Sequence, residues 1–427
     1  MNTYSAYKDS GEQWLGQIPA HWEMRQWRFL LKENVTPNTD CKETQQLQFK
    51  YGEIIPKANQ EIDSDTLKII CKYNKVQPND IMINGLNLNY DFISQRIGMV
   101  RTNGIITSAY ISLRPIGSAN PSYYNYLLKA MDAQKVFHGM GTGVRLTLSY
   151  KELKSKYLPF PTEAEQKAMV AYLDEQTGKL DQAIARELKM IDLLEERKQI
   201  IIQQAVTKGL NPNAIMKDSG IEWIGEIPEG WKVIKTARVF CHIGSGTTPS
   251  SSNVDYYAEE GFNWLQTGDL NNADIYRTAK HITSKAVREK SMKFYPVDSL
   301  VVAMYGATIG KVGLLKIETS VNQACCVLPP TNKMDMRYAK YLYISAKHAL
   351  IRESEGGGQP NISQQVVKNL RIPVPPKEEQ QFIVSYLDEH LVGINRAIDA
   401  REKMIALLQE RKQIIINEVV TGKIKVL

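Results

Sequence analysis

The chain has 427 residues, of which 43% are hydrophobic and 23% charged, so we expect two or three folded domains rather than a disordered chain. The opening residues lack the apolar core of a signal peptide. The longest apolar run, 299–315, contains Gly306, Gly310 and Lys311 and would make a poor membrane span. The five cysteines show no Cys-x-x-Cys spacing, so we expect no zinc cluster, and an adjacent pair such as Cys325–Cys326 rarely forms a disulfide. These features predict a soluble, cytoplasmic protein from a reducing compartment.

The net charge of +7 is concentrated in two separate blocks. Residues 25–157 carry 18 Lys and Arg against 11 Asp and Glu, and residues 234–371 carry 17 against 11. The remainder of the chain carries 18 against 24 and is therefore acidic. Two basic blocks suggest two contacts with a polyanion, although many domains of this size carry a few excess lysines.

One phrase occurs twice, 209 positions apart: KDSGEQWLGQIPAHW at 8–22 and KDSGIEWIGEIPEGW at 217–231. Each copy holds two tryptophans eight residues apart, at Trp14 and Trp22 and at Trp223 and Trp231. We favour a packing role for these side chains over base stacking, because large aromatic residues are more often buried anchors. The repeat indicates that the chain is built from two tandem halves.

Short apolar runs separated by turn signals fill both basic blocks. In the first block, 76–84, 96–100 and 108–115 predict strands and 121–131 predicts a helix. In the second, strands are expected at 262–266, 295–306, 311–317 and 322–330, followed by a helix over 336–350. A short helix capped by Ser149 or Ser363 should end each block. The order of elements is similar, whereas the sequences differ.

After each block comes a long amphipathic stretch, 162–207 and 377–421, and the two match at a constant offset of 214. Thr162 and Glu165 form a capping box for the first helix, and Gly178 and Gly393 could bend the helices. One apolar stripe recurs in both copies, at Val170, Leu173, Leu180, Ile184, Ile191, Leu194, Ile201 and Ala205, and at Val384, Leu387, Ile394, Ile398, Ile405, Leu408, Ile415 and Val419. We expect the helices to pair antiparallel within one chain, with pairing between chains as the alternative.

The sequence shows no catalytic motif. Residues 306–312, GATIGKV, are one residue short of a phosphate loop between the glycines and lack the Ser or Thr after the lysine. The six histidines are scattered without metal-ligand spacing. Asp80 and Asp298 follow prolines in turns, but no Glu-x-Lys of a metal-dependent nuclease comes after them. We therefore expect no catalytic residue and no metal site.

Several of these segments resemble those of one known family, the DNA-specificity (S) subunits of type I restriction–modification enzymes. The resemblance covers nearly the whole chain. It is carried by PVPPKEEQ at 373–380, by the paired YLDE and ERKQIII helices, and by the Trp-x-Gly-x-Ile-Pro phrases. The second block adds GSGTTPSSSNVDYY, WLQTGDL and AMYGATIGKVGLL, which look like one common type of target-recognition domain. The first block lacks these stretches and looks like a second type.

The resemblance implies an α+β fold, with two mixed α/β target-recognition domains separated by two long antiparallel helices in a pseudo-two-fold repeat. The implied domains are 1–157 and 211–371 for recognition and 158–210 and 372–427 for the helices. Each recognition domain would read one half of a split double-stranded DNA site. The helices would act as a ruler and dock two modification (methyltransferase) subunits, which restriction (translocase-nuclease) subunits can join. S-adenosylmethionine, ATP and magnesium would belong to those partners, and the chain itself would not be an enzyme.

Basic residues near turns are the candidate DNA contacts, namely Arg96, Arg101 and Arg145 in the first block and Lys280, Lys285, Arg288, Lys290, Lys293 and Lys311 in the second. Three alternatives stay open at this stage. They are the specificity module of a methyltransferase-only system, a fused methyltransferase–specificity enzyme, and a coiled-coil scaffold without a DNA role. The target sequence does not follow from the residues, since base readout depends on a few side chains placed in the major groove.

Overall fold

The computed structural model describes residues 3–50, 52–58, 63–88, 95–141, 146–306, 308–354 and 361–426. The chain forms two compact units, of which one comprises 1–188 with 402–427 and the other 189–401. The first basic block lies in the first unit, and the second basic block lies in the second unit. Each unit also takes a part of both long helices, so the helices do not form a separate body.

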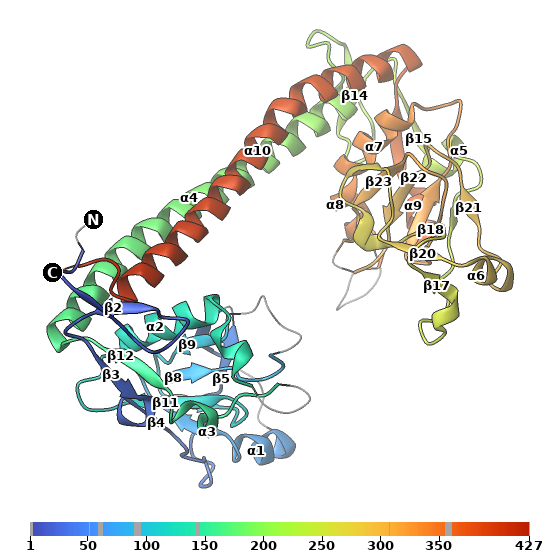
Figure 1. The fold of residues 1–427 in the computed structure, drawn as a ribbon. Coiled ribbons are helices and arrows are strands. Elements are labelled where there is room, and N and C mark those ends of the chain that lie inside the picture. The colour runs from blue at the N-terminus through green and yellow to red at the C-terminus, as the bar shows by residue number, and fades with distance from the viewer. Residues whose placement is uncertain are drawn as a thin grey trace. The chain divides into compact units, whose positions relative to one another are not determined.

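A four-stranded antiparallel sheet, ordered β4-β11-β8-β9, is the centre of the first unit, and α2 packs against β9 (Figure 1). Two-stranded ladders, β1-β2, β3-β12, β5-β6 and β7-β10, surround it. The strands are β1 Tyr7–Asp9, β2 Gln17–Pro19, β3 Glu23–Gln26, β4 Leu31–Glu33, β5 Leu47–Lys50, β6 Glu53–Pro56, β7 Asn74–Val76, β8 Ile81–Ile83, β9 Ile97–Met99, β10 Gly104–Ile106, β11 Ile111–Pro115 and β12 Tyr157–Phe160. The shorter helices are α1 Ser64–Ile70, α2 Pro121–Ala133 and α3 Tyr150–Leu153.

Two five-stranded sheets, β16-β25-β22-β23-β19 and β17-β20-β18-β24-β21, build the second unit. Each contains one parallel pair, β19 with β23 and β18 with β24. Two further ladders are β13-β14 and β15-β26. The strands are β13 Met216–Asp218, β14 Glu226–Pro228, β15 Lys232–Lys235, β16 Gly244–Ser245, β17 Tyr257–Ala258, β18 Phe262–Leu265, β19 Ala273–Ile275, β20 Lys280–Ile282, β21 Phe294–Tyr295, β22 Leu300–Ala303, β23 Val312–Leu315, β24 Thr319–Val321, β25 Cys325–Leu328 and β26 Arg371–Val374. The shorter helices are α5 Thr236–Val239, α6 Ser284–Glu289, α7 Met336–Ser345, α8 Lys347–Arg352 and α9 Gln364–Asn369.

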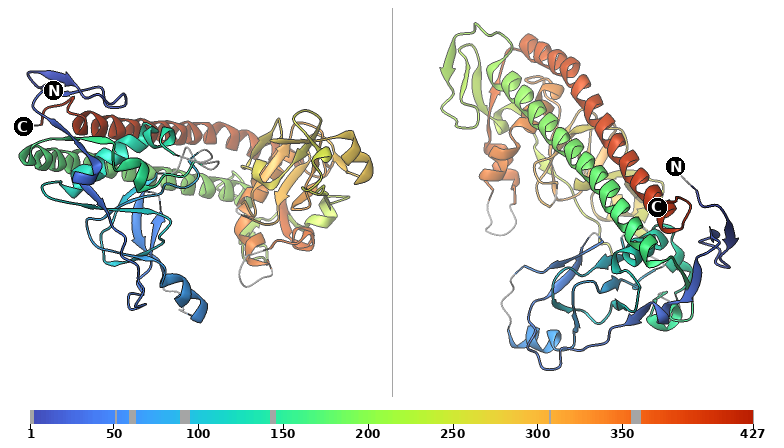
Figure 2. Two further views of the ribbon diagram at one scale, coloured as in Figure 1. Left: turned by 60° about the horizontal axis from the view of Figure 1, so that its bottom comes forward. Right: turned by 90° about the vertical axis from the view of Figure 1, so that its left-hand side faces the viewer.

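The long helices are α4 Glu163–Lys208, with 46 residues, and α10 Lys377–Val420, with 44. In the first unit the beginning of α4 shares a core with the end of α10, through Leu173 and Val419. In the second unit the end of α4 shares a core with the beginning of α10, through Ile202 and Leu387. Within each unit the two helices therefore run antiparallel and side by side, as the views in Figure 2 show.

The mixed α/β architecture with two long helices confirms the expected fold class. The helices pass through Gly178 and Gly393 without a break, because both glycines keep helical backbone bonds. The helix expected over 336–350 is divided at Ala346 into α7 and α8. Ser149 and Ser363 cap α3 and α9 as predicted.

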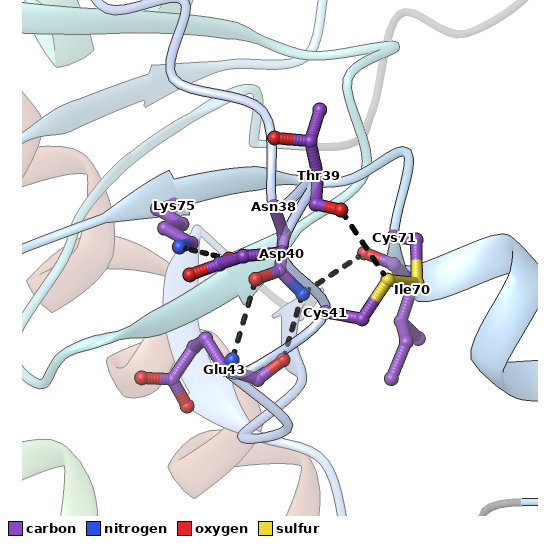
Figure 3. The surroundings of a disulfide bond; sticks show 8 residues. All are labelled: Asn38, Thr39, Asp40, Cys41, Glu43, Ile70, Cys71 and Lys75. Carbon is purple, nitrogen blue, oxygen red and sulfur yellow. Dashed lines mark hydrogen bonds and ion pairs between the residues drawn. A yellow bond between two sulfur atoms is a disulfide. The ribbon is translucent and has the colours of Figure 1, made fainter.

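A disulfide joins Cys41 and Cys71, whose Cα atoms lie 4.8 Å apart and which are 30 residues apart in the sequence (Figure 3). This bond was not expected, because the sequence predicted a protein from a reducing compartment, where disulfides are rare. The pairing depends on a turn that brings Cys41 to the end of α1, which cysteine spacing does not reveal. No helix among the residues that the structure describes is both long and apolar enough to span a membrane.

Candidate nucleic-acid interface and helix junctions

Four of the predicted DNA contacts gather around α6 in the second unit. Lys285 and Arg288 lie on this helix, and Lys290 and Lys293 follow it before β21. Thr283 begins the helix by accepting a hydrogen bond from the amide of Ala286, whose side chain is buried. Because only one face of so short a helix is buried, its basic side chains remain accessible to a polyanion.

Local partners orient three of these four cations. Lys285 forms an ion pair of 2.8 Å with Asp255, and this hydrogen bond raises the pKa of the lysine. The ammonium groups of Lys290 and Lys293 lie 5.4 Å and 5.0 Å from the ring centres of Tyr256 and Tyr295. Exposed contacts of this kind are weak, so a phosphate group can replace them at little cost.

Lys280 and Lys311 lie outside the α6 cluster. Lys280 is exposed on β20 and lines a hollow of about 570 Å³ together with Tyr257, Trp264, Gln266 and His281. Lys311 is half-buried immediately before β23. Lys280 therefore borders a space that a planar or polar group could enter, whereas Lys311 offers only part of its side chain.

The three predicted DNA contacts of the first unit do not form a cluster. Arg101 is exposed after β9, and Arg145 lies outside the described residues. Arg96 is only 1% exposed, and its guanidinium donates hydrogen bonds of 3.0 and 2.8 Å to the carbonyl oxygens of Asn84 and Leu86. Arg96 is thus a packing residue in this structure and is not carried into the proposed DNA surface. The sequence predicted a strand at this arginine, but it could not predict that main-chain carbonyl groups would surround the guanidinium.

A smaller hollow of about 240 Å³ in the first unit has Lys75 and Arg114 in its lining. Both cations already have carboxylate partners. Lys75 lies 2.5 Å from Asp40, and Arg114 binds the fully buried carboxylate of Asp80 at 2.8 Å. Their charges are therefore largely neutralised within the unit, which makes this hollow a weaker candidate for an anion.

None of the predicted stripe residues on the long helices is exposed. On α10 six of the eight stripe residues are buried, whereas on α4 only two are buried and the other six are half-buried. The buried ones are Leu173, Ala205, Val384, Leu387, Ile394, Ile398, Ile415 and Val419. The half-buried ones are Val170, Leu180, Ile184, Ile191, Leu194, Ile201, Ile405 and Leu408.

A dense set of hydrogen bonds joins the first block to the long helices. The buried indole of Trp22 donates to Glu165 at the start of α4, and the amide of Asn120 donates to the side chain of Gln166 at 2.8 Å. From α2, the buried hydroxyl of Tyr123 donates to the carbonyl of Val420 at 3.0 Å. The block is therefore held by its own helix α4 and by the last turn of α10.

The second block repeats this arrangement residue for residue. Trp231 donates to Glu379 at 2.9 Å, and the amide of Asp335 donates to Gln380 at 2.7 Å. Tyr338 donates to the carbonyl of Val206 at 3.0 Å, close to the end of α4. Further repeated bonds join Tyr126 to Asp174 and Tyr341 to Asp388, and Gln166 and Gln380 to the carbonyl oxygens of Pro161 and Pro375. The packing role expected for the tryptophans holds for Trp22 and Trp231.

Glu165 is the most heavily bonded carboxylate of the first junction. Burial raises its pKa, whereas hydrogen bonds from Thr162, His21 and Trp22 lower it, and the net direction is downward. The contact with His21 is 2.8 Å long. The second unit has Gly230 at the matching position, so this histidine contact belongs to the first junction alone.

A second apolar row, outside the predicted stripe, escaped the sequence analysis. Its six side chains are 41% to 59% exposed, and the residue types agree at the offset of 214. They are Met190, Leu193 and Ile200 on α4 and Met404, Leu407 and Ile414 on α10. Arg197 and Arg411 lie one turn beyond the leucines on the same helix face. The identity of these positions between the repeats was the signal that could have revealed them.

Comparison with known proteins gives matches over most of the chain. The family model for the type I restriction modification DNA specificity domain matches residues 228–401. Two specificity subunits from Methanocaldococcus jannaschii match most of the chain. The putative type I restriction enzyme MjaX subunit is 23% identical over 425 residues, which cover 96% of both chains. The MjaVIII subunit is 26% identical over 381 residues, which cover 86% of this chain and 84% of the relative. The chain is therefore similar to type I restriction enzyme specificity subunits over most of its length.

One solved structure has a fold similar to that of this chain. It comes from work on complex assembly and conformational transition of the type I R-M system, and it aligns with a TM-score of 0.65 at 16% identity. The alignment covers 95% of this chain and 99% of that one. The matched relatives are named as the specificity subunits of their restriction enzymes. Among the described residues, no group of three or more His, Cys, Asp or Glu side chains could hold a metal ion.

Proposed function

We propose that this chain is the DNA-reading subunit of a type I restriction–modification complex, in which each recognition block reads one half of a bipartite site. The observation that supports this most is the repeated junction. Two blocks of different sequence are attached to the long helices by the same hydrogen bonds, from Trp22 and Tyr123 in one and from Trp231 and Tyr338 in the other. A shared attachment with different inserts fits two readers of different sequences.

The α6 cluster is the proposed phosphate contact of the second block. Replacing Lys285, Arg288, Lys290 and Lys293 by glutamine should weaken binding to every duplex sequence, because phosphate contacts do not depend on the bases. The slope of log K against log salt should fall by about 0.9 for each phosphate contact that is lost. The matched control replaces Lys232 and Lys235, which are exposed on β15 of the same unit, and should change neither quantity. Unchanged affinity and slope in the α6 variant would reject this surface.

The second apolar row is the proposed docking site for two methyltransferase subunits. Each subunit would cover one row, Met190 to Ile200 or Met404 to Ile414, with an apolar helix face that carries an acid opposite Arg197 or Arg411. Leu193→Gln or Leu407→Gln alone should lower the bound methyltransferase from two copies to one, and the double variant should bind none. Native mass spectrometry of the co-expressed complex measures these copies. Phe382→Gln is the control, because Phe382 is 70% exposed on α10 but has the much smaller Ala168 at the matching position, so it is not part of a repeated row.

S-adenosylmethionine, ATP and magnesium would enter the complex with the partner subunits. The decisive experiment is methylation mapping of the host genome with and without the gene for this chain. A split motif should lose its methylation on deletion and regain it on complementation. An unchanged methylation pattern, together with full activity of the methyltransferase without this chain, would contradict the proposed function.

A further inference from the structure

The Cys41–Cys71 disulfide links two segments of the first unit that differ in how many other contacts hold them in place. One is the loop that contains Cys41, and the other is the short helix α1, which ends just before Cys71 (Figure 3). Both sulfur-bearing residues are partly exposed, so small thiols and disulfides can reach them. What the bond does depends on which of the two segments would move without it.

The loop is firmly anchored without the disulfide. The amide of the fully buried Asn38 donates to the carbonyl of Tyr73 at 2.8 Å, and its side chain donates to the carbonyl of Glu43 at 2.8 Å. The amide of Lys75 donates to the carbonyl of Thr36 at 2.7 Å. The main-chain bonds tie the loop to the segment around β7 before Cys41, and the bond from Asn38 to Glu43 closes the loop around Cys41. The loop should therefore keep its path when the sulfur atoms separate.

Helix α1 has much less to hold it. It is seven residues long and buries only Ile70, whereas Leu67 and Ile69 are 39% and 54% exposed. A helix of this length is not stable by itself in water. Apart from its cap at Asp63, the ties near its end are a weak 3.4 Å hydrogen bond from Asn38 to the carbonyl of Ile70 and the disulfide itself. Loss of the disulfide should therefore loosen α1 rather than the loop.

Lysines surround the bond. Lys42 and Lys72 directly follow the two cysteines, Lys68 lies on α1, and all three are exposed. The acidic residues nearby have partners of their own, since Asp40 pairs with Lys75, Asp65 with Lys68, and Asp63 accepts the amide of Thr66. The exposed pair of Asp65 and Lys68 is worth little and can yield to a phosphate. The disulfide thus fixes the position of three exposed lysines, which stand among a similar number of acidic residues.

We propose that the Cys41–Cys71 pair is a redox latch that sets how firmly the first recognition block grips the DNA backbone. The proposal rests on the proposed DNA-binding function and adds its regulation. In the closing step, one cysteine thiolate attacks a low-molecular-weight disulfide and expels one thiol. The second cysteine then attacks the mixed disulfide and expels the other thiol, so the protein loses two electrons and two protons while the small disulfide is reduced. A dithiol reverses both steps.

The effect should be confined to the first unit. In the second unit, Cys241 is exposed and unpaired, and Cys325 and Cys326 are buried as free thiols. Burial raises the pKa of Cys326 to about 12 and also raises the pKa of Cys325. Both thiols therefore stay protonated and unreactive at neutral pH. Oxidation state would therefore change one half-site contact and leave the other unchanged.

The test uses the full chain in complex with its methyltransferase partner, treated with oxidised glutathione or with dithiothreitol. Peptide mass mapping reports the bond, hydrogen exchange of residues 64–71 reports α1, and titration with a random-sequence duplex at several salt concentrations reports the DNA contact. Reduction should speed hydrogen exchange in α1 and weaken duplex binding by about 3- to 10-fold. The slope of log K against log salt should become shallower by an amount that corresponds to about one to two phosphate contacts. The Cys41→Ser/Cys71→Ser variant should match the reduced protein and ignore dithiothreitol, whereas Cys241→Ser should match the wild type.

Two results would overturn the latch. One is free thiols at both positions after treatment with the small disulfide. The other is a bond that forms while exchange, affinity and salt slope stay the same in both redox states. If neither state binds a duplex at all, the proposed function fails and so does the DNA role of the latch, while hydrogen exchange still decides whether the bond holds α1. Failure of the latch and failure of the function are thereby distinguished.

Discussion

The two units differ in almost everything except the way in which they meet the long helices. The first is built on one antiparallel four-stranded sheet, and the second on two five-stranded sheets with parallel pairs. Yet the junction of each contains a tryptophan bonded to a glutamate, a glutamine bonded to a helix-starting amide, and a tyrosine bonded to a helix-ending carbonyl. The repeat is therefore kept where the blocks are attached to the helices and is lost in the parts that we propose to read DNA.

The strongest test of this equivalence is to keep only one half. A fragment of residues 1–212 contains one phrase, one block and α4, but it lacks the end of α10 to which Tyr123 is bonded. A second copy can supply Val206 in place of Val420 and cover the apolar stripe, where each fully buried side chain contributes roughly 1.5–3 kcal/mol before association costs. We expect a two-fold symmetric dimer that directs methylation to an interrupted palindrome. Sedimentation and methylation mapping measure this, and a folded monomer or a non-palindromic motif would show that the halves are not equivalent.

Removing one anchoring tryptophan should separate the stabilities of the two units. Trp22→Ala and Trp231→Ala each empty a buried site and should destabilise their own unit by about 3–5 kcal/mol. Hydrogen exchange should then rise in residues 3–188 for the first variant and in residues 189–401 for the second. Trp22→Phe is a milder control, since it keeps most of the apolar volume and loses the bond to Glu165. Equal loss of protection in both units from either variant would contradict separate junctions.

The two tyrosine bonds should be energetically equal. Tyr123→Phe and Tyr338→Phe each take a hydroxyl donor from a buried carbonyl, at a cost of about 1–3 kcal/mol. Urea denaturation followed unit by unit should give similar losses for the two variants. Tyr305→Phe removes an exposed hydroxyl bond of 3.3 Å to the carbonyl of Gln323 and should cost less than about 0.5 kcal/mol. A large difference in the free energy of unfolding between the first two variants would mean that the two tyrosine bonds contribute unequally despite their similar geometry.

The smallest expected difference between the two units is that the stability of the first junction depends on pH. The pKa of Glu165 is lowered in the folded chain, so its contribution to stability is present above its usual value of 4.5 and is lost as the pH falls through the lower, folded value. Hydrogen exchange or thermal unfolding between pH 6 and pH 3 measures this, with those limits chosen to lie roughly on either side of a normal glutamate pKa. Glu165→Gln should flatten this part of the profile. A profile that the substitution leaves unchanged would assign the acid sensitivity to other groups.

Periodicity revealed the parts of the fold that local patterns determine. The stripe on α4 and α10 and the capping box of Thr162 and Glu165 follow from spacing alone, and the structure shows the cap as bonds of 3.0 and 3.3 Å. The division of the helix at Ala346 depends on packing around α7 and α8, which no local pattern encodes. For the site, charge counting located the basic blocks but could not separate the buried Arg96 from the exposed Arg101, because burial is set by residues distant in sequence.

The tyrosine bonds at the junctions end on main-chain oxygen atoms of Val206 and Val420, and the glutamine bonds end on those of Pro161 and Pro375. A carbonyl is present whatever side chain its residue carries. The acceptor positions can therefore drift in sequence without loss of the bond, as long as the helix keeps its path, while the donors Tyr123 and Tyr338 and the glutamines cannot. Across distant descendants of such a chain, the donors should be retained more strictly than the residues that they touch.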